Sequence, residues 1–119
     1  MSIYTGEILI GKKSNLVFST TPTSIPDNTY DSAVFTGGAN AILNLPPLAN
    51  IIHGYKLTIG NSATGSFSVT VTAQGSDHIG SSGTTSTLAL TQGQTAALLA
   101  DRINGRWQIA LGPISLPTP

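Results

Sequence analysis

Few residues in this chain could do chemistry, and the most suggestive of them form the run Ser76-Asp77-His78. Serine, aspartate and histidine together can make a hydrolase triad, and aspartate and histidine can also bind a metal ion. A triad requires the histidine to lie between the other two side chains, whereas neighbouring residues on a strand or tight loop point apart. A metal site would need further ligands, and apart from His53 only scattered carboxylates remain. We therefore interpret the run as a polar turn.

The other candidates for acid–base chemistry are equally weak. Asp27 and Asp31 lie in a segment rich in proline and asparagine, where aspartate usually hydrogen-bonds to its own backbone as a turn residue. His53 lies between an apolar loop and the expected start of a strand, which favours a structural role over a ligand role. The sequence predicts no catalytic residue, no metal site, no cofactor and no enzymatic activity.

One aromatic residue has basic neighbours. Arg102 and Arg106 flank an expected turn and Trp107 follows directly, which could give a cation–π pair or a small platform for a sugar. The alternative is that Trp107 belongs to the core together with Ile109 and Leu111, and we favour it because these residues alternate at strand spacing.

Composition limits the classes of partner. Only 8% of the 119 residues are charged, and five basic residues cancel five acidic ones, so no electrostatic field exists to attract nucleic acid or an anionic membrane. The N-terminus has no basic region followed by an apolar run, and no stretch approaches the ~18 apolar residues that span a bilayer. We expect synthesis in a cytoplasm, no nucleic acid or membrane partner, and a neutral surface covered by other subunits.

The same composition favours one β-domain. The chain has 16 Thr and 13 Ser, with 13 Gly and 7 Pro to supply turns and no Cys to form disulfides. Alternating segments predict a hairpin from 55–59 to 67–72, a strand at 87–91, and a second hairpin in which a two-residue Asn104-Gly105 turn joins 95–101 to 106–111. The run 96–100 could be helical by propensity, but its length and bracketing glycines favour a strand.

These segments predict an all-β fold, an antiparallel β-sandwich or jelly-roll-like barrel of about eight strands. Before residue 41 we expect strands around 4–10, 16–20 and 33–35. The domain boundaries would be 1–14 for an N-terminal arm or first strand, 15–112 for the β-domain and 113–119 for an extended, proline-rich tail. The expected core comprises Leu43, Leu45, Leu57, Ile59, Phe67, Val69, Val71, Leu88, Leu90, Trp107 and Ile109. Thr58, Ser68, Thr70 and Gln108 should face solvent or a neighbouring subunit.

A series of short motifs follows in a set order between residues 41 and 111. They are Leu45-Pro46, Gly54-Tyr-Lys-Leu-Thr-Ile-Gly-Asn61, Ser68-Val-Thr-Val71, Gly75, Ile79-Gly80, Thr87-Leu88, Gly93-Gln-Thr95 and Asn104-Gly-Arg-Trp107. This order resembles the small β-domains of structural proteins from tailed bacteriophages, both capsid decoration proteins and tail-fibre or spike modules. The resemblance implies a virion module that forms a homotrimer. The first forty residues have no match, and no repeat-rich fibre shaft is present.

Two functions are compatible with this resemblance. The first is a capsid decoration or cement protein on the virion surface, which binds the major capsid protein and stabilises the assembled shell. The alternative is a tail-fibre, baseplate or head-fibre module that recognises a host-surface glycan. Such a module would need aromatic and amide side chains at its loop tips, whereas 61–65 and 80–85 carry mainly Gly, Ser, Thr and Ala. We therefore rank recognition second.

The N-terminal segment is the expected contact with the shell. It contains strand-forming residues outside the matched region, and Gly6 and Gly11 would let it reach away from the domain. An extended arm can add a strand to an exposed sheet edge of a capsid subunit. The alternative, that it is the first strand of the domain, stays open. The candidate capsid-binding residues are Ile3, Tyr4, Glu7, Ile8, Leu9, Ile10, Lys12 and Lys13.

Overall fold

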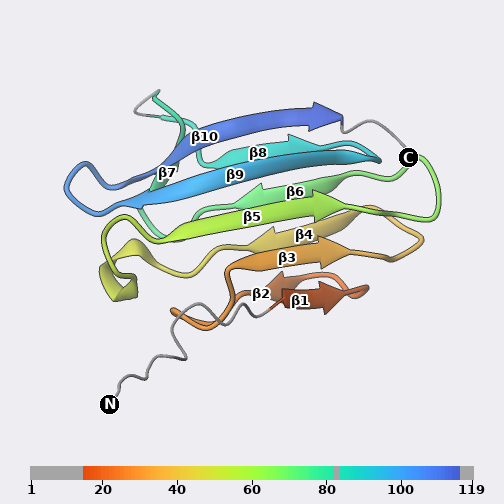
Figure 1. The fold of residues 1–119 in the computed structure, drawn as a ribbon, viewed down its shortest axis with the longest axis horizontal. Coiled ribbons are helices and arrows are strands. Elements are labelled where there is room, and N and C mark those ends of the chain that lie inside the picture. Colours follow the sequence, from red (N-terminus) through yellow and green to blue (C-terminus); the bar gives the residue numbers. More distant parts are fainter. Residues whose placement is uncertain (1–14, 82–83, 116–119) are drawn as a thin grey trace, which may run out of the picture.

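The computed structural model describes residues 15–81 and 84–115 of the chain, and these form two β-sheets packed face to face (Figure 1). Besides ten strands, the described residues contain one 3-10 turn, Leu48–Asn50, and no helix long and apolar enough to cross a bilayer. The predicted all-β sandwich is confirmed. The strands are β1 (Asn15–Phe18), β2 (Thr23–Ser24), β3 (Ser32–Phe35), β4 (Ala41–Asn44), β5 (Lys56–Asn61), β6 (Val69–Thr72), β7 (His78–Ile79), β8 (Thr87–Leu90), β9 (Gln94–Asp101) and β10 (Arg106–Ser115).

The chain changes sheet after almost every strand. One sheet has the order β1-β3-β5-β9-β10-β7 and the other has the order β2-β4-β6-β8. Strands two apart in the chain therefore become neighbours, and β1, β3 and β5 run parallel, as do β2, β4 and β6. β8 and β9 then run antiparallel to their neighbours, so both sheets are mixed instead of purely antiparallel as expected. Parallel pairing follows because each winding between the sheets brings the chain back in its original direction.

One of the two predicted hairpins is wrong and the other is confirmed. β5 and β6 belong to different sheets, because the connection 62–68 crosses the gap of about 10 Å between the sheets instead of folding back within one. β9 and β10 do form an antiparallel hairpin, with Asp101 opposite Arg106. Its turn has the four residues 102–105 instead of two, and within it only Gly105 has a positive φ, of 66°.

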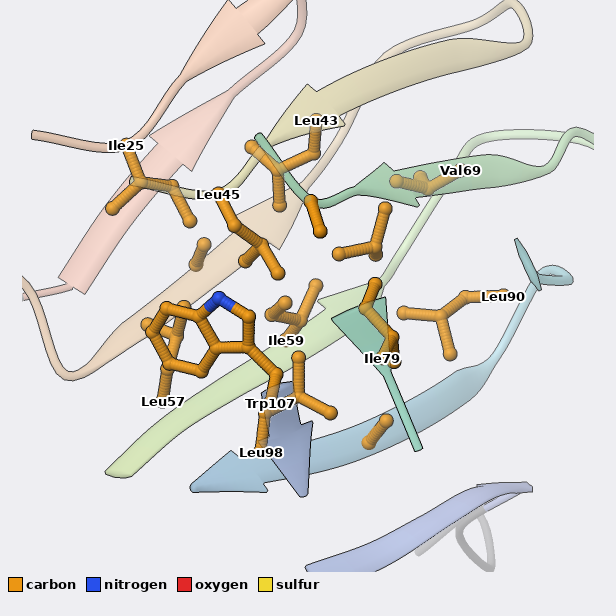
Figure 2. Close-up of a cluster of buried hydrophobic side chains, with 14 of the residues drawn as sticks. Ile25, Leu43, Leu45, Leu57, Ile59, Val69, Ile79, Leu90, Leu98 and Trp107 are labelled. Atoms are coloured by element: carbon orange, nitrogen blue, oxygen red, sulfur yellow. The ribbon is translucent and has the colours of Figure 1, made fainter. Parts of the chain in front are cut away.

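The core lies between the two sheets, and Figure 2 shows the indole of Trp107 among its aliphatic side chains. Eight of the expected core residues are buried, whereas Phe67 and Leu88 are half-buried at its margin. The residues that alternate with the core residues along the strands, Thr58 and Thr70 among them, are partly exposed as predicted. The buried eight are Leu43, Leu45, Leu57, Ile59, Val69, Val71, Leu90 and Trp107.

The second half of β10 departs from the sequence prediction. The register with β9 shifts between Ile109 and Leu111, so Leu111 lies opposite Ala97 and no longer shares the inward face of Trp107. Ile109 is 39% exposed and Leu111 is 48% exposed, so the expectation that both belong to the core is wrong. β7 covers only the start of β10, and the strand beyond it is a sheet edge.

The expected boundary at the C-terminal end of the domain lies too early, and the segment before the N-terminal boundary lies outside the described residues. Residues 113–115 continue β10, with Ile114 opposite Thr95, so the expected tail does not begin at residue 113. Pro113 is tolerated there because an edge strand can lack an N–H on its open side. The run 96–100 is a strand as predicted. The N-terminal segment 1–14, with its expected strand, and residues 116–119 lie outside the described residues.

Candidate functional site

The run Ser76-Asp77-His78 is built into the fold as a turn followed by a strand. Asp77 Oδ2 accepts a hydrogen bond of 2.9 Å from the backbone N–H of Leu48 and thereby joins the turn to the 3-10 segment. His78 starts β7 beside Arg106, and its backbone N–H donates to Gly105 O at 3.0 Å. Asp77 and His78 therefore each make a structural hydrogen bond, which favours the interpretation of this run as a polar turn. Among the described residues, no three His, Asp or Glu side chains lie close enough together to hold a metal ion.

The remaining candidates from the sequence lie beside hydrogen bonds that hold the fold together. The carbonyl of Asp27 accepts a hydrogen bond from Thr29 Oγ1 at 2.9 Å, which is a turn contact. His53 Nδ1 accepts from the backbone N–H of Arg102 at 3.2 Å, a contact that favours a structural role. Near Asp31, the Tyr55 hydroxyl donates to the carbonyl of Tyr30, and burial followed by the Asp31 charge raises the pKa of Tyr55.

Asp101 organises the end of the β9–β10 hairpin. Its Oδ1 accepts from the backbone N–H of Asn104 at 3.1 Å, and its Oδ2 accepts from Asn104 Nδ2 at 2.8 Å and Gln108 Nε2 at 2.9 Å. The Asn104 and Gln108 side chains, the Asn104 backbone and the nearby His53 together lower the pKa of Asp101 to about 2. These hydrogen bonds use both carboxylate oxygens of Asp101 to hold the turn.

Trp107, the second residue of β10, has no exposed surface and cannot serve as a sugar platform.

Two hollows lie at opposite ends of the strands. The His53 hollow, of about 360 Å³, lies where β9 ends and is lined mainly by apolar atoms; its residues are His53, Gly54, Leu99, Ala100, Asp101, Ile103, Asn104 and Gln108. The Phe67 hollow, of about 340 Å³, lies where β4 and β6 begin and β8 ends. It has no charged side chain, and its residues are Asn40, Ser66, Phe67, Ser68, Thr91 and Gln92.

The buried side chain of Asn61 holds together the loops that form the Phe67 hollow. Its Nδ2 donates to the carbonyls of Phe67 and Leu90, both at 2.9 Å, and its Oδ1 accepts from the N–H of Ala63 at 3.0 Å. Asn61 is only 2% exposed, so these bonds are shielded from water. The loop between β5 and β6 and the loop after β8 are therefore fixed against each other.

The outer face of the six-stranded sheet carries one mainly apolar row, next to rows that also contain the polar Ser32 and Thr58 and the charged Lys56. Val17, Val34, Gly60, Thr95 and Ile114 stand in one row across five strands. A Cβ at Gly60 would lie 3.5 Å from Val34 Cγ2 and 3.6 Å from Thr95 Oγ1, so the side chains of this row share a face. We call this row, together with Ala97 and Leu111 of the adjacent row, the apolar face.

The outer face of the four-stranded sheet has a different chemistry. Apart from Ile42 and Ala89, the residues that stand on it are hydroxyl or amide side chains. Ile42, 46% exposed, is its only large apolar side chain among the described strands. The two faces of the sandwich therefore differ: the outer face of the six-stranded sheet has a row of mainly apolar residues beside polar ones, whereas the outer face of the four-stranded sheet offers mainly hydrogen-bonding groups. The polar residues are Ser24, Asn44, Thr70, Thr72 and Thr87.

The expected capsid-binding residues lie in 1–14, outside the described residues, so the structure places none of them. It does place the point where this segment joins the domain. Asn15 begins β1, which is an edge strand of the six-stranded sheet, and Val17 two residues later is 59% exposed on the apolar face.

Sequence reasoning missed the Phe67 hollow because its residues come from three separate segments. Asn40, Ser68 and Thr91 each stand one residue outside the register row Ala41–Val69–Leu90, so strand pairing alone brings them together. The parallel pairing of β4 with β6 was not expected, and without it no motif marks the three residues as neighbours.

No protein family, curated protein or solved structure matches this chain.

Proposed function

We propose that this protein is a non-catalytic structural protein of a virion, a capsid decoration or cement protein that binds the major capsid protein as a homotrimer and stabilises the assembled shell. The observation that carries the proposal is the apolar face. Val17 and Leu111 are 59% and 48% exposed on it. The chain also has few charges that could keep copies apart, since only 8% of its residues are charged and its net charge is zero. An exposed apolar surface of this kind marks an interaction site.

The occupant of the apolar face is a neighbouring copy of the same chain. Because the net charge is zero, identical copies do not repel one another. Five strands at about 4.8 Å spacing and four residues at ~3.3 Å, the length of β1 and β3, give a footprint of roughly 300 Å² on each partner. Other surface of the domain must therefore contribute to reach the ~1,000 Å² total of a specific interface. In the trimer, three apolar faces turn toward a common threefold axis.

The segment 1–14 makes the contact with the shell. It joins the domain at edge strand β1, and an edge position lets a preceding segment leave the body without crossing either sheet face. Ile3, Tyr4, Ile8, Leu9 and Ile10 supply strand-forming side chains for pairing with an exposed sheet edge of a capsid subunit. Glu7, Lys12 and Lys13 supply the charges at this contact.

The experiment deletes residues 2–11 and measures folding by circular dichroism and binding to purified shells by co-sedimentation. A matched control deletes residues 116–119 from the other end of the chain. We expect the first deletion to keep the fold and lose binding, and the control to keep both. Full binding by the first deletion would refute the attachment claim, and loss of folding would identify the segment as part of the domain.

The Phe67 hollow favours the second candidate, a fibre or baseplate module that recognises a host-surface glycan. The structure brings two amides and an aromatic ring together at one end of the sandwich. The location of the protein in the particle separates the two functions: immunogold labelling over the whole shell fits a decoration protein, whereas labelling confined to the tail fits a recognition module.

A further inference from the structure

We propose that the Phe67 hollow is a binding site for one ring of a neutral saccharide. The site uses none of the residues assigned to shell attachment or to the apolar face, and the proposal rests on the second candidate function, glycan recognition, and names its ligand class. Its residues come from the loop before β4, the loop between β5 and β6, and the loop after β8.

The amide groups in the hollow are held in place and still offer polar atoms to a ligand. Asn40 Oδ1 accepts from the N–H of Ser68 at 3.0 Å, and its Nδ2 has no partner among the described residues. Gln92 Nε2 donates to the carbonyl of Ala63 at 3.1 Å, and its Oε1 is likewise without a partner there. The site therefore presents a fixed donor and a fixed acceptor, which together suit the hydroxyl groups of a sugar.

The hydroxyl groups add adaptable hydrogen bonding. Ser66, Ser68 and Thr91 line the same hollow, and each hydroxyl can donate one hydrogen bond and accept two. A sugar hydroxyl has the same dual capacity, so the pairing works for several orientations of the ring.

Phe67 supplies the apolar part of the site. Its ring is half-buried and lies against Gly65, where an added Cβ would be 2.9 Å from ring atom Cε2. A glycine at position 65 thus lets the ring pack against the loop. The face of an aromatic ring is the negative part of its quadrupole and attracts the C–H groups that cover one side of a pyranose.

Charge and size define the ligand class. Since no charged residue lines the hollow, it has nothing to pair with a phosphate, a sulfate or an acidic sugar. Its volume of about 340 Å³ lies at the small end of the ~300–1,000 Å³ of ligand sites. The loops are already held by Asn61, which reduces the ordering cost of binding.

The test is a titration of the ¹⁵N-labelled full chain followed by NMR. The probes are methyl glucoside, methyl galactoside, methyl mannoside, N-acetylglucosamine and maltotriose, each to about 100 mM, because a small ligand in a shallow site binds with a dissociation constant on the order of millimolar. We expect at least one probe to shift the backbone amides of residues 66–68 and 91–92 in a saturable way. A neutral peptide, N-acetyl-serylglycinamide, is titrated in parallel.

Two variants and one control test the assignment. Gln92→Ala removes the acceptor, and Phe67→Leu keeps an apolar side chain but removes the ring; each should weaken saccharide binding at least fivefold. Asn50→Ala removes an exposed amide outside the hollow and should leave binding unchanged. Thermal unfolding establishes that each variant is folded. The proposal is overturned if no saccharide shifts these amides, if only the peptide does, or if the folded Gln92→Ala and Phe67→Leu variants bind like the parent chain.

Discussion

Asn61 shows how a single buried polar side chain can define a surface. Its amide satisfies one carbonyl and one N–H of the loop between β5 and β6, and the carbonyl of Leu90 at the end of β8, while the side chain itself is only 2% exposed. A buried polar group that loses its partner costs more than an ordinary hydrogen bond contributes, because it stays desolvated and unpaired. The shape of the Phe67 hollow therefore depends on a residue that the hollow does not expose.

Replacing Asn61 by alanine leaves those three backbone groups without their partner. We expect the free energy of unfolding to fall by about 2–4 kcal/mol, as measured by urea denaturation. The control is Asn50→Ala, an exposed amide on the 3-10 turn, which should change the free energy of unfolding by less than about 0.5 kcal/mol. Equal effects of the two substitutions would contradict the structural role given to Asn61.

Asp101 should make stability depend on acidic pH. Its pKa of about 2 in the folded protein lies below the ordinary value of 3.8, so ionisation of this group stabilises the fold. That contribution is complete above about pH 4 and is lost as the pH falls toward 2. Asp101→Asn, which puts an amide donor against the donors of Asn104 and Gln108, should lower the melting temperature at pH 7.

The same pair of proteins compared at pH 2 provides the check. There the Asp101 carboxyl is about half protonated in the folded parent and nearly fully protonated in the unfolded chain, so most of the stabilisation by its ionisation is gone. The difference in melting temperature between the parent and Asp101→Asn should therefore shrink. A difference that is constant from pH 7 to pH 2 would mean that ionisation of Asp101 does not contribute to stability.

At the scale of the strands, the alternation of apolar and polar residues was sufficient to locate most of the elements. It placed Leu57, Ile59, Val69 and Val71 inward correctly, because a period of two fixes which residues share a face. It could not predict which strands pair. Two successive strands show the same alternation whether the connection between them stays within one sheet or crosses to the other. The false hairpin between β5 and β6 has this origin.

Register shifts are a second limit on the prediction. Ile109 and Leu111 continue the alternation of Trp107, and nothing in their identity signals that the chain slips against β9 between them. The hollow at Phe67 was missed for a related reason: its residues become neighbours only through the parallel pairing of β4 with β6. Local sequence does not encode such distant pairings.

The register of β6 can be tested with a matched pair of substitutions. Val69 has no exposed surface and faces the core, whereas the next residue, Thr70, is half-buried on the outer face. Val69→Ala should lower the free energy of unfolding by about 1–3 kcal/mol through lost burial and the cavity left behind. Thr70→Ala should cost less in the same denaturation experiment, and the opposite order would place β6 one residue out of register.

At the scale of the whole molecule, the two faces of the sandwich make assembly testable. We expect sedimentation equilibrium at micromolar concentration to give a trimer. Val17→Lys and Ile114→Lys put charges on the apolar face, and each should shift the protein toward monomer, because burying an unpaired charge in an interface is costly. Ile42→Lys changes an exposed apolar residue on the other face and should leave the trimer intact.

Two results would argue against this assignment of the apolar face. A parent chain that is monomeric would show that the face does not hold copies together in solution. Dissociation caused equally by Ile42→Lys would show that the interface lies elsewhere or that added charge acts through general repulsion.

The central claim is that the protein coats a shell, and its copy number in purified virions tests this most directly. Quantitative mass spectrometry against isotope-labelled peptides gives the ratio of this chain to the major capsid protein. A shell lattice repeats each contact at every equivalent position, so the account predicts hundreds of copies per particle in a fixed, simple ratio to the capsid subunit. A count of a few tens or fewer would contradict it and place the protein in the tail.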